Sequence, residues 1–105
     1  MDEGKEIEKR LRKVIDPELG FNIVELGLVY EIKIKKNKAI VKMTFTTPSC
    51  PLAPIIIEDV KKNLKGIKGI KGIKEVEVVV SFDPPWTPEM ASGEARAALE
   101  QFMGP

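Results

Sequence analysis

The single cysteine of this chain, Cys50, is the side chain best suited to covalent or metal chemistry. It stands between Ser49 and Pro51, where an expected strand has ended and an expected helix begins. Unpaired N–H groups and the helix dipole stabilise negative charge at a helix N-terminus, which lowers the pKa of a thiol and favours the thiolate. A thiolate attacks electrophiles and binds metals. The alternative is a small buried residue, because free cysteines are among the most buried side chains.

Polar side chains in the loops form a second group of candidates. Asp16 and Glu18 lie in the first loop of the chain, and Thr47 lies in the turn that contains Cys50. Loop carboxylates are usually solvated groups that form turns. The functional alternative is that some of them converge near Cys50, where they supply oxygen ligands or hold the loops around it.

The only tryptophan, Trp86, lies on a stiff segment between prolines. Its ring either covers one end of the core or anchors a partner protein, a role in which tryptophan is favoured. The sequence leaves both alternatives open.

The composition excludes several classes of function. The chain has 105 residues, no histidine and one cysteine. Ser-His-Asp triads, Cys-His pairs and histidine metal sites are therefore excluded. One thiolate cannot build a closed iron–sulfur cage, so any cluster would be shared between chains. The formal net charge of +1 disfavours bulk binding to nucleic acid or to anionic membranes. The charged N-terminus has no apolar run for a signal peptide or a membrane span, so we expect a cytoplasmic protein.

Apolar periodicity predicts the elements that position these residues. The expected elements are a helix over 7–15, strands over 30–35 and 39–46, a helix over 53–66, a strand over 75–82 and a helix over 92–102. The fold class is α+β: a two-layer sandwich in the order α-β-β-α-β-α, with a three-stranded sheet covered by helices. A right-handed crossover makes the second and third strands parallel. The alternation does not decide whether the third strand pairs with the first or the second. One domain over 1–105 is expected.

The outer face of the expected sheet is a candidate interface. Strand alternation places Val29, Ile40 and Val79 on this face, and outward apolar residues on several strands are typical of an interaction surface. This predicts a homodimer. The alternative is that the last helix folds over these residues.

A threefold Lys-Gly-Ile repeat lies between the second helix and the third strand, within 65–74. One interpretation is an extended, solvated linker. The other is a phosphate-gripping loop over Gly66–Gly72, as in a KH-like RNA-binding module, with charge from Lys68. A KH loop lies between two helices rather than before a strand, which weighs against RNA binding.

Four short motifs follow one another along the chain. They are Asp16-Pro17-Glu18, Leu26-Gly27-Leu28-Val29-Tyr30, Thr47-Pro48-Ser49-Cys50-Pro51 and Asp83-Pro84-Pro85-Trp86-Thr87. Together, in the predicted element order, they resemble the SufT-like family of iron–sulfur assembly domains. That family includes PaaD-like proteins and the eukaryotic cytosolic iron–sulfur targeting factors. The resemblance covers nearly the whole chain, from about Ile7 to about Leu99.

The resemblance implies a non-enzymatic factor that assembles iron–sulfur clusters or transfers them to apoproteins. Cys50 is then the functional thiol and metal ligand, and Asp16, Glu18, Thr47 and Trp86 are secondary site residues. The implied cargo is an iron–sulfur cluster or iron, held transiently and shared between chains. The implied partners are iron–sulfur carriers and client apoproteins. A thiol enzyme using a lysine or a carboxylate as its base is a further alternative.

Overall fold

The computed structural model describes residues 3–46, 51–65, 70 and 72–103. Its elements follow the predicted order α-β-β-α-β-α. They are α1 (Glu3–Leu11), β1 (Val29–Lys35), β2 (Lys38–Met43), α2 (Ala53–Leu64), β3 (Glu75–Val80), the short 3-10 helix η2 (Pro88–Met90) and α3 (Gly93–Met103).

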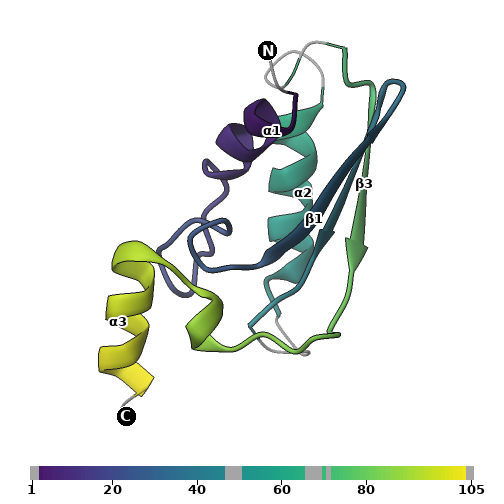
Figure 1. Cartoon of the computed structure of the whole chain (residues 1–105). Helices are drawn as coiled ribbons and strands as arrows, with labels where there is room; N and C mark the ends of the chain where they lie inside the picture. Colours follow the sequence, from purple (N-terminus) through teal and green to yellow (C-terminus); the bar gives the residue numbers. More distant parts are fainter. Residues whose placement is uncertain (1–2, 47–50, 66–69, 71, 104–105) are drawn as a thin grey trace.

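The sheet has the strand order β1-β2-β3, with β2 in the centre. β1 is antiparallel to β2, and β3 is parallel to β2, as the helical crossover predicts. β3 therefore pairs with β2 and not with β1, a choice that the sequence alternation left undecided. Helices α1 and α2 lie on one face of the sheet, whereas α3 packs against η2 beyond its end (Figure 1). The two-layer α+β architecture is confirmed, and no described helix covers the other face of the sheet.

The core lies between β2 and the two covering helices. Alternate residues of β2 are fully buried on the helical side: Ala39, Val41 and Met43. The apolar stripes of the helices meet them: Ile7 and Leu11 of α1, and Ile56, Val60 and Leu64 of α2. These spacings are those of a strand with one covered face and of amphipathic helices, so the periodicity predicts the core correctly.

The first helix is shorter than its apolar pattern predicts. It ends at Leu11 rather than at residue 15, and the next turn is closed by tighter bonds, from the Val14 N–H to the Leu11 carbonyl at 3.0 Å. Val14 is nevertheless buried, while Ile15 is 45% exposed and pairs with Asn22 in an isolated bridge. The chain turns after Leu11 and still buries Val14, which is why the spacing alone suggested a longer helix.

The pairing of β1 with β2 contains one irregularity. Val29 is opposite Met43, but Glu31 is opposite Lys42, so Tyr30 is an extra residue in the register. Such a bulge shifts the alternation of sides by one residue. Val29 therefore packs against the core, and the prediction that it lies on the outer face is wrong.

The outer face of the sheet carries mostly charged side chains. They are Glu31, Lys33, Lys35, Lys38, Lys42, Glu75 and Glu77. Ile40 and Val79 lie on this face as predicted, but the register sets Ile40 between Lys33 and Glu77. The two apolar residues therefore do not form a continuous apolar surface with Val29.

Candidate functional site

Cys50 and Thr47, the candidate thiol and its polar neighbour, lie outside the described residues. The chain on either side is described: β2 ends at Met43, and α2 begins at Ala53 with a proline in its first turn. Pro51, bonded to Cys50, is exposed. The expected helix after the cysteine is therefore confirmed, while the state of the thiol stays a prediction.

The chain leading out of β2 is anchored by Thr44. This residue is fully buried, and its backbone N–H donates to the Leu28 carbonyl at 2.8 Å. On the other side of β2, the Ser81 N–H donates to the Met43 carbonyl at 2.9 Å. The segment that leads to Cys50 therefore leaves the sheet between two fixed loops.

Asp16 is a buried carboxylate that fastens the first loop. Its side chain is 2% exposed, and its Oδ1 accepts backbone N–H groups from Glu18 at 2.8 Å and Leu19 at 3.3 Å. The Asp16 backbone also donates to the Phe21 carbonyl and accepts from the Gly20 N–H. The expectation of a turn-forming carboxylate is confirmed, but Asp16 is buried rather than solvated. Glu18 is exposed.

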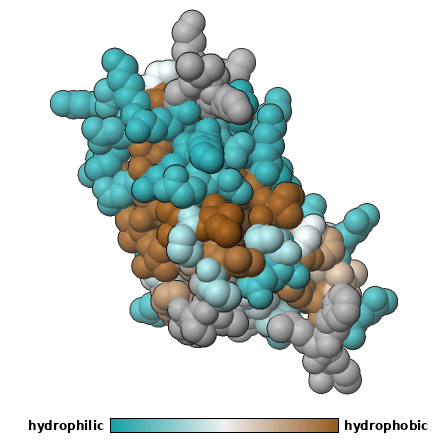
Figure 2. Space-filling model, turned by 180° about the vertical axis from the view of Figure 1, so that it is seen from behind, coloured by the Kyte–Doolittle hydropathy of each residue, from teal (hydrophilic) through white to brown (hydrophobic). Residues whose placement is uncertain are grey.

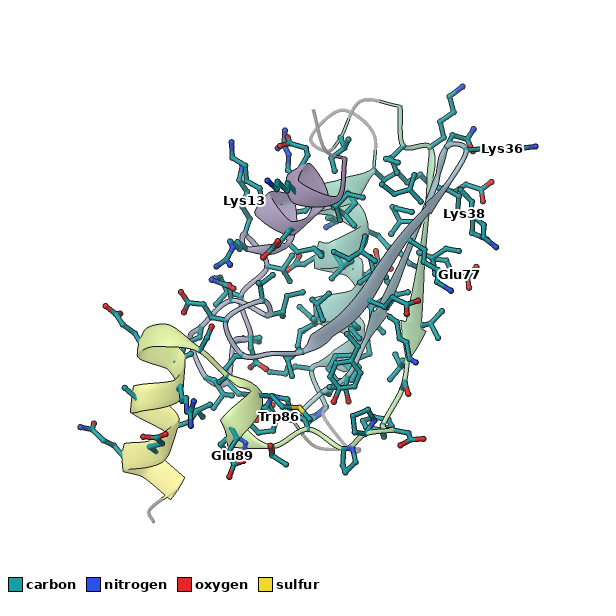
Figure 3. All side chains as sticks on the ribbon, in the orientation of Figure 1. Lys13, Lys36, Lys38, Glu77, Trp86 and Glu89 are labelled. Atoms are coloured by element: carbon teal, nitrogen blue, oxygen red, sulfur yellow. The ribbon has the colours of Figure 1, made fainter. Side chains whose placement is uncertain are left out.

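Trp86 is half buried against the core. Its indole Nε1 donates to the Leu26 carbonyl at 2.6 Å, which ties the segment after β3 to the loop before β1 (Figure 3). The interpretation of Trp86 as a cover over one end of the core is confirmed, and its role as a partner anchor stays a hypothesis. Asp16 and Trp86 thus fasten different turns, at 18–19 and at Leu26.

Tyr30 of β1 also holds the segment that follows β3. Its hydroxyl donates to the Pro84 carbonyl at 2.8 Å and lies 3.6 Å from the Met90 sulfur. The sequence pattern placed Tyr30 at the start of the strand over 30–35 and did not predict this contact. The available signal was the hydroxyl itself, because a tyrosine near a core usually has a polar partner for it.

Gly27, in the loop before β1, lies against Met90 of η2. Gly27 has φ +75°, and a Cβ built there would overlap the Met90 carbonyl oxygen. The Ser92 N–H donates to the Glu25 carbonyl at 2.8 Å. Residues 84–92 therefore lie along residues 25–30, joined by backbone contacts at several points.

An open groove of about 540 Å³ lies beside Tyr30. Its lining residues are Gly27, Val29, Tyr30, Glu31, Lys42, Asp83, Pro84 and Met90. The groove carries charged groups of both signs and contains neither Asp16 nor Trp86. Among residues 3–46, 51–65, 70 and 72–103, no group of three or more metal-ligating side chains occurs. Within those same ranges, no helix has the length and apolarity needed to cross a membrane.

The candidate RNA-binding loop falls largely outside the described residues, at 66–69 and 71. It connects α2 to β3 and therefore does not join two helices. Ile70 and Ile73 are buried in the core, so the interpretation of the repeat as a solvated linker is wrong for these two residues. Isoleucines of the repeat anchor the loop to the domain.

Comparison with known proteins gives one consistent result. Residues 5–80 match the family model described as iron–sulfur cluster assembly protein. The chain is 43% identical over 90 residues, 85% of each protein, to the Fe-S protein maturation auxiliary factor YitW of Bacillus subtilis. It is 45% identical over 87 residues to the maturation auxiliary factor SufT of Staphylococcus aureus, with 82% of this chain and 96% of that protein covered. A solved domain of unknown function from Bacillus anthracis has a TM-score of 0.83 at 43% identity, covering 90% of this chain and 89% of that one.

Proposed function

This chain belongs to the iron–sulfur cluster assembly protein family, and we propose that it is a non-enzymatic factor that helps assemble iron–sulfur clusters or transfer them to apoproteins. The observation that carries this proposal is the similarity to two Fe-S protein maturation auxiliary factors over most of both chains. Its partners are iron–sulfur carriers and client apoproteins.

Cys50 is the thiol that contacts the cargo. It is the only cysteine of the chain, and the next residue is exposed and leads into α2. The N-terminus of this helix favours a thiolate, which is the form that binds iron. Because common clusters use four thiolates, the remaining ligands come from a second chain, either a carrier or a client. Incomplete ligation by one protein makes the bound cluster labile, which suits transfer.

The secondary site residues act on the surroundings of the thiol. Asp16 and Trp86 hold loops through backbone contacts, so they shape the surface without binding iron. Glu18 is exposed beside Asp16, and Thr47 precedes Cys50 in the sequence. These two supply polar contacts to a bound partner.

Anaerobic reconstitution with iron and sulfide tests this function. In the absence of a partner protein, we expect one cluster per two chains, because two thiolates and a small-molecule thiol complete the ligand set. Cys50→Ala should abolish the cluster, and Ser49→Ala, which leaves the thiol in place, should retain it. Iron and sulfide per chain and the visible absorption spectrum are the measurements. A cluster retained in Cys50→Ala, or no cluster in the unaltered protein, contradicts the role of Cys50.

Alkylation of Cys50 by iodoacetamide as a function of pH gives an independent test. A thiol at a helix N-terminus should show a midpoint below the ordinary value of about 8.5. A midpoint at or above that value means that Cys50 is a buried structural residue.

A further inference from the structure

The two edges of the sheet differ in how they are protected from pairing with another strand. β1 carries Lys33 and Lys35 and the bulge at Tyr30, which are common protections of an edge strand. β3 has the sequence EVEVVV, without proline or lysine, and its register with β2 is regular throughout. Apolar side chains at its C-terminal half are exposed: Val79 38%, Val80 39% and, just beyond, Phe82 40%. The edge of β3 is therefore available for pairing.

Hydrogen bonds identify which backbone groups of β3 face this open edge. The Glu75 N–H donates to the Asn37 carbonyl, and the Ser81 N–H donates to the Met43 carbonyl, so both residues turn toward the β2 side. In a parallel pair, alternate residues point their backbone groups to opposite sides. The N–H and C=O groups of Val76, Val78 and Val80 therefore point away from β2, along the open edge.

We propose that two copies of this chain pair through antiparallel β3 edges, about a two-fold axis at Val78, to form one continuous sheet. In this register Val78 is opposite its own copy, Val76 is opposite Val80, and Glu77 is opposite Val79. The three residues whose N–H and C=O groups point along the open edge, Val76, Val78 and Val80, then all lie in hydrogen-bonded pairs. An axis at Glu77 sets two like charges opposite each other, which is destabilising. An axis at Val79 leaves Val76 without a partner inside the strand.

The side chains of β3 support the same arrangement. Val76, Val78 and Val80 are in register with Ala39, Val41 and Met43, so they point to the face that α2 covers. Although their neighbours on β2 are fully buried, the three valines of β3 are only partly covered or exposed. A band of apolar surface crosses the back of the molecule below its hydrophilic part (Figure 2). A second β3 continues the sheet and brings a second α2, with Ile55 54% exposed, beside the first.

This inference goes beyond the proposed function, because the pairing needs neither iron nor a client. Antiparallel pairing places the C-terminal ends of the two β2 strands, from which each chain leads to Cys50, at opposite ends of the joint sheet. The two chain segments that lead to Cys50 therefore start at opposite ends of the β3 dimer. A pair of chains bridged by a cluster would use a different contact.

Sedimentation of the iron-free full chain tests the dimer. We expect the unaltered protein and Cys50→Ala to form dimers and Val78→Pro to be a monomer. A proline at position 78 removes an edge N–H without removing a bond to β2, which is the position an edge strand tolerates. Circular dichroism and thermal unfolding establish that Val78→Pro folds. A monomer at the highest soluble concentration of the unaltered protein, or a dimer that persists in folded Val78→Pro, overturns the proposal.

A pair of variants at one position tests the register. Val79→Lys sets a lysine opposite Glu77 of the second copy and should tighten the dimer, whereas Val79→Glu sets two carboxylates opposite each other and should weaken it. Each symmetric dimer contains this pair twice, so the two dissociation constants should differ from the unaltered value by roughly twofold to thirtyfold in opposite directions. Val79 is also opposite Lys42 of β2 in the same chain, so each variant changes a contact within the chain as well. Thermal unfolding of each variant measures how far this contact changes the stability of the fold. Equal effects of the two variants, or a tighter dimer with Val79→Glu, overturn the register. Because the dimer is measured without iron and is expected in Cys50→Ala as well, failure of this proposal and failure of the cluster role are separate outcomes.

Discussion

The loops before β1 and after β3, which we call the loop end, differ from the outer face of the sheet in the role of their polar side chains. At the loop end, Asp16, Tyr30 and Trp86 each make hydrogen bonds to backbone groups, and Asp16 is buried. On the outer face, Lys38 and Glu77 form an ion pair of 2.7 Å between side chains that are 36% and 48% exposed. The first set fixes the path of the backbone, while the second set lies on a backbone that the β ladder already fixes.

This difference indicates where a change in sequence should matter. Removing the Asp16 or Trp86 side-chain contact leaves a partly buried backbone group without its partner, which costs more free energy than the hydrogen bond itself contributes. Removing an exposed ion pair returns both groups to water at little cost. The loop end also carries three of the four motifs, those around Asp16, Leu26 and Trp86, and each of them contains one side chain that fastens a loop.

The largest effect should come from Gly27→Ala. Its backbone is in the left-handed region, and the added Cβ would overlap the Met90 carbonyl oxygen. We expect a loss of about 2 to 5 kcal/mol in the free energy of unfolding, measured by urea denaturation. Gly20→Ala is the matched control, because Gly20 has φ +77° but nothing lies within 4 Å of its Cβ position. It should lose only about 1 to 2 kcal/mol. Equal losses would mean that the approach of Gly27 to Met90 contributes nothing.

Asp16→Ala should have the next largest effect. It leaves the N–H groups of Glu18 and Leu19 without their acceptor, so we expect a loss of about 1 to 3 kcal/mol in the free energy of unfolding. Asp16→Asn keeps an oxygen acceptor and should recover most of this loss. In anaerobic reconstitution, Asp16→Ala should retain more cluster than Cys50→Ala. A complete loss of cluster in a folded Asp16→Asn protein would instead indicate that this carboxylate binds iron.

Trp86→Phe should have a smaller effect. Phenylalanine keeps an aromatic ring against the core but removes the donor to the Leu26 carbonyl. The expected loss is about 0.5 to 1.5 kcal/mol in urea denaturation. Tyr30→Phe is the parallel variant, because it removes the donor to the Pro84 carbonyl and leaves the ring. If both variants are as stable as the unaltered protein, these two side-chain hydrogen bonds contribute nothing to the stability of the loop end.

The sequence predicted the elements and the core because both depend on local periodicity. The buried residues of β2 and the stripe of α2 follow directly from alternation and helical spacing. Strand order does not, because β3 would show the same alternation beside β1 as beside β2. The bulge at Tyr30 has no local signal, and it reversed the side on which Val29 was expected.

The candidate site was predictable in part. The residue type of Asp16 and the proline after it indicate a turn, but its burial depends on how the whole chain folds. Likewise, the donor of Trp86 meets Leu26, a residue far away in the sequence, and only the folded chain brings the two together. Asp16 and Trp86 were therefore identified by residue type, and their hydrogen-bond partners were found only in the structure.

The smallest effect should come from the ion pair between Lys38 and Glu77, which tests the outer face. The hydrogen bond and charge of Glu77 raise the pKa of Lys38 above its ordinary value of 10.5, and Lys38 lowers the pKa of Glu77 below 4.5. A carboxylate with a lowered pKa stabilises the fold above its unfolded-state value, and the contribution is lost as pH falls through the folded value. A lysine with a raised pKa stabilises below its unfolded-state value and loses the contribution as pH rises through the folded one. The coupling should therefore be constant near neutral pH and disappear only in acid and in strong base.

A double-mutant cycle of Lys38→Gln and Glu77→Gln, followed by thermal unfolding, measures that coupling. We expect a coupling free energy smaller than the loss of stability in any variant at the loop end, because both side chains are exposed and salt screens their charges. High salt should abolish this coupling at neutral pH. The pair of Glu31 and Lys33, on the same face at 3.2 Å, is the matched comparison and should behave alike. A coupling that survives high salt, or one as large as the effect of Asp16→Ala, would mean that the outer face also depends on specific polar contacts. The contrast between the two regions would then be one of degree.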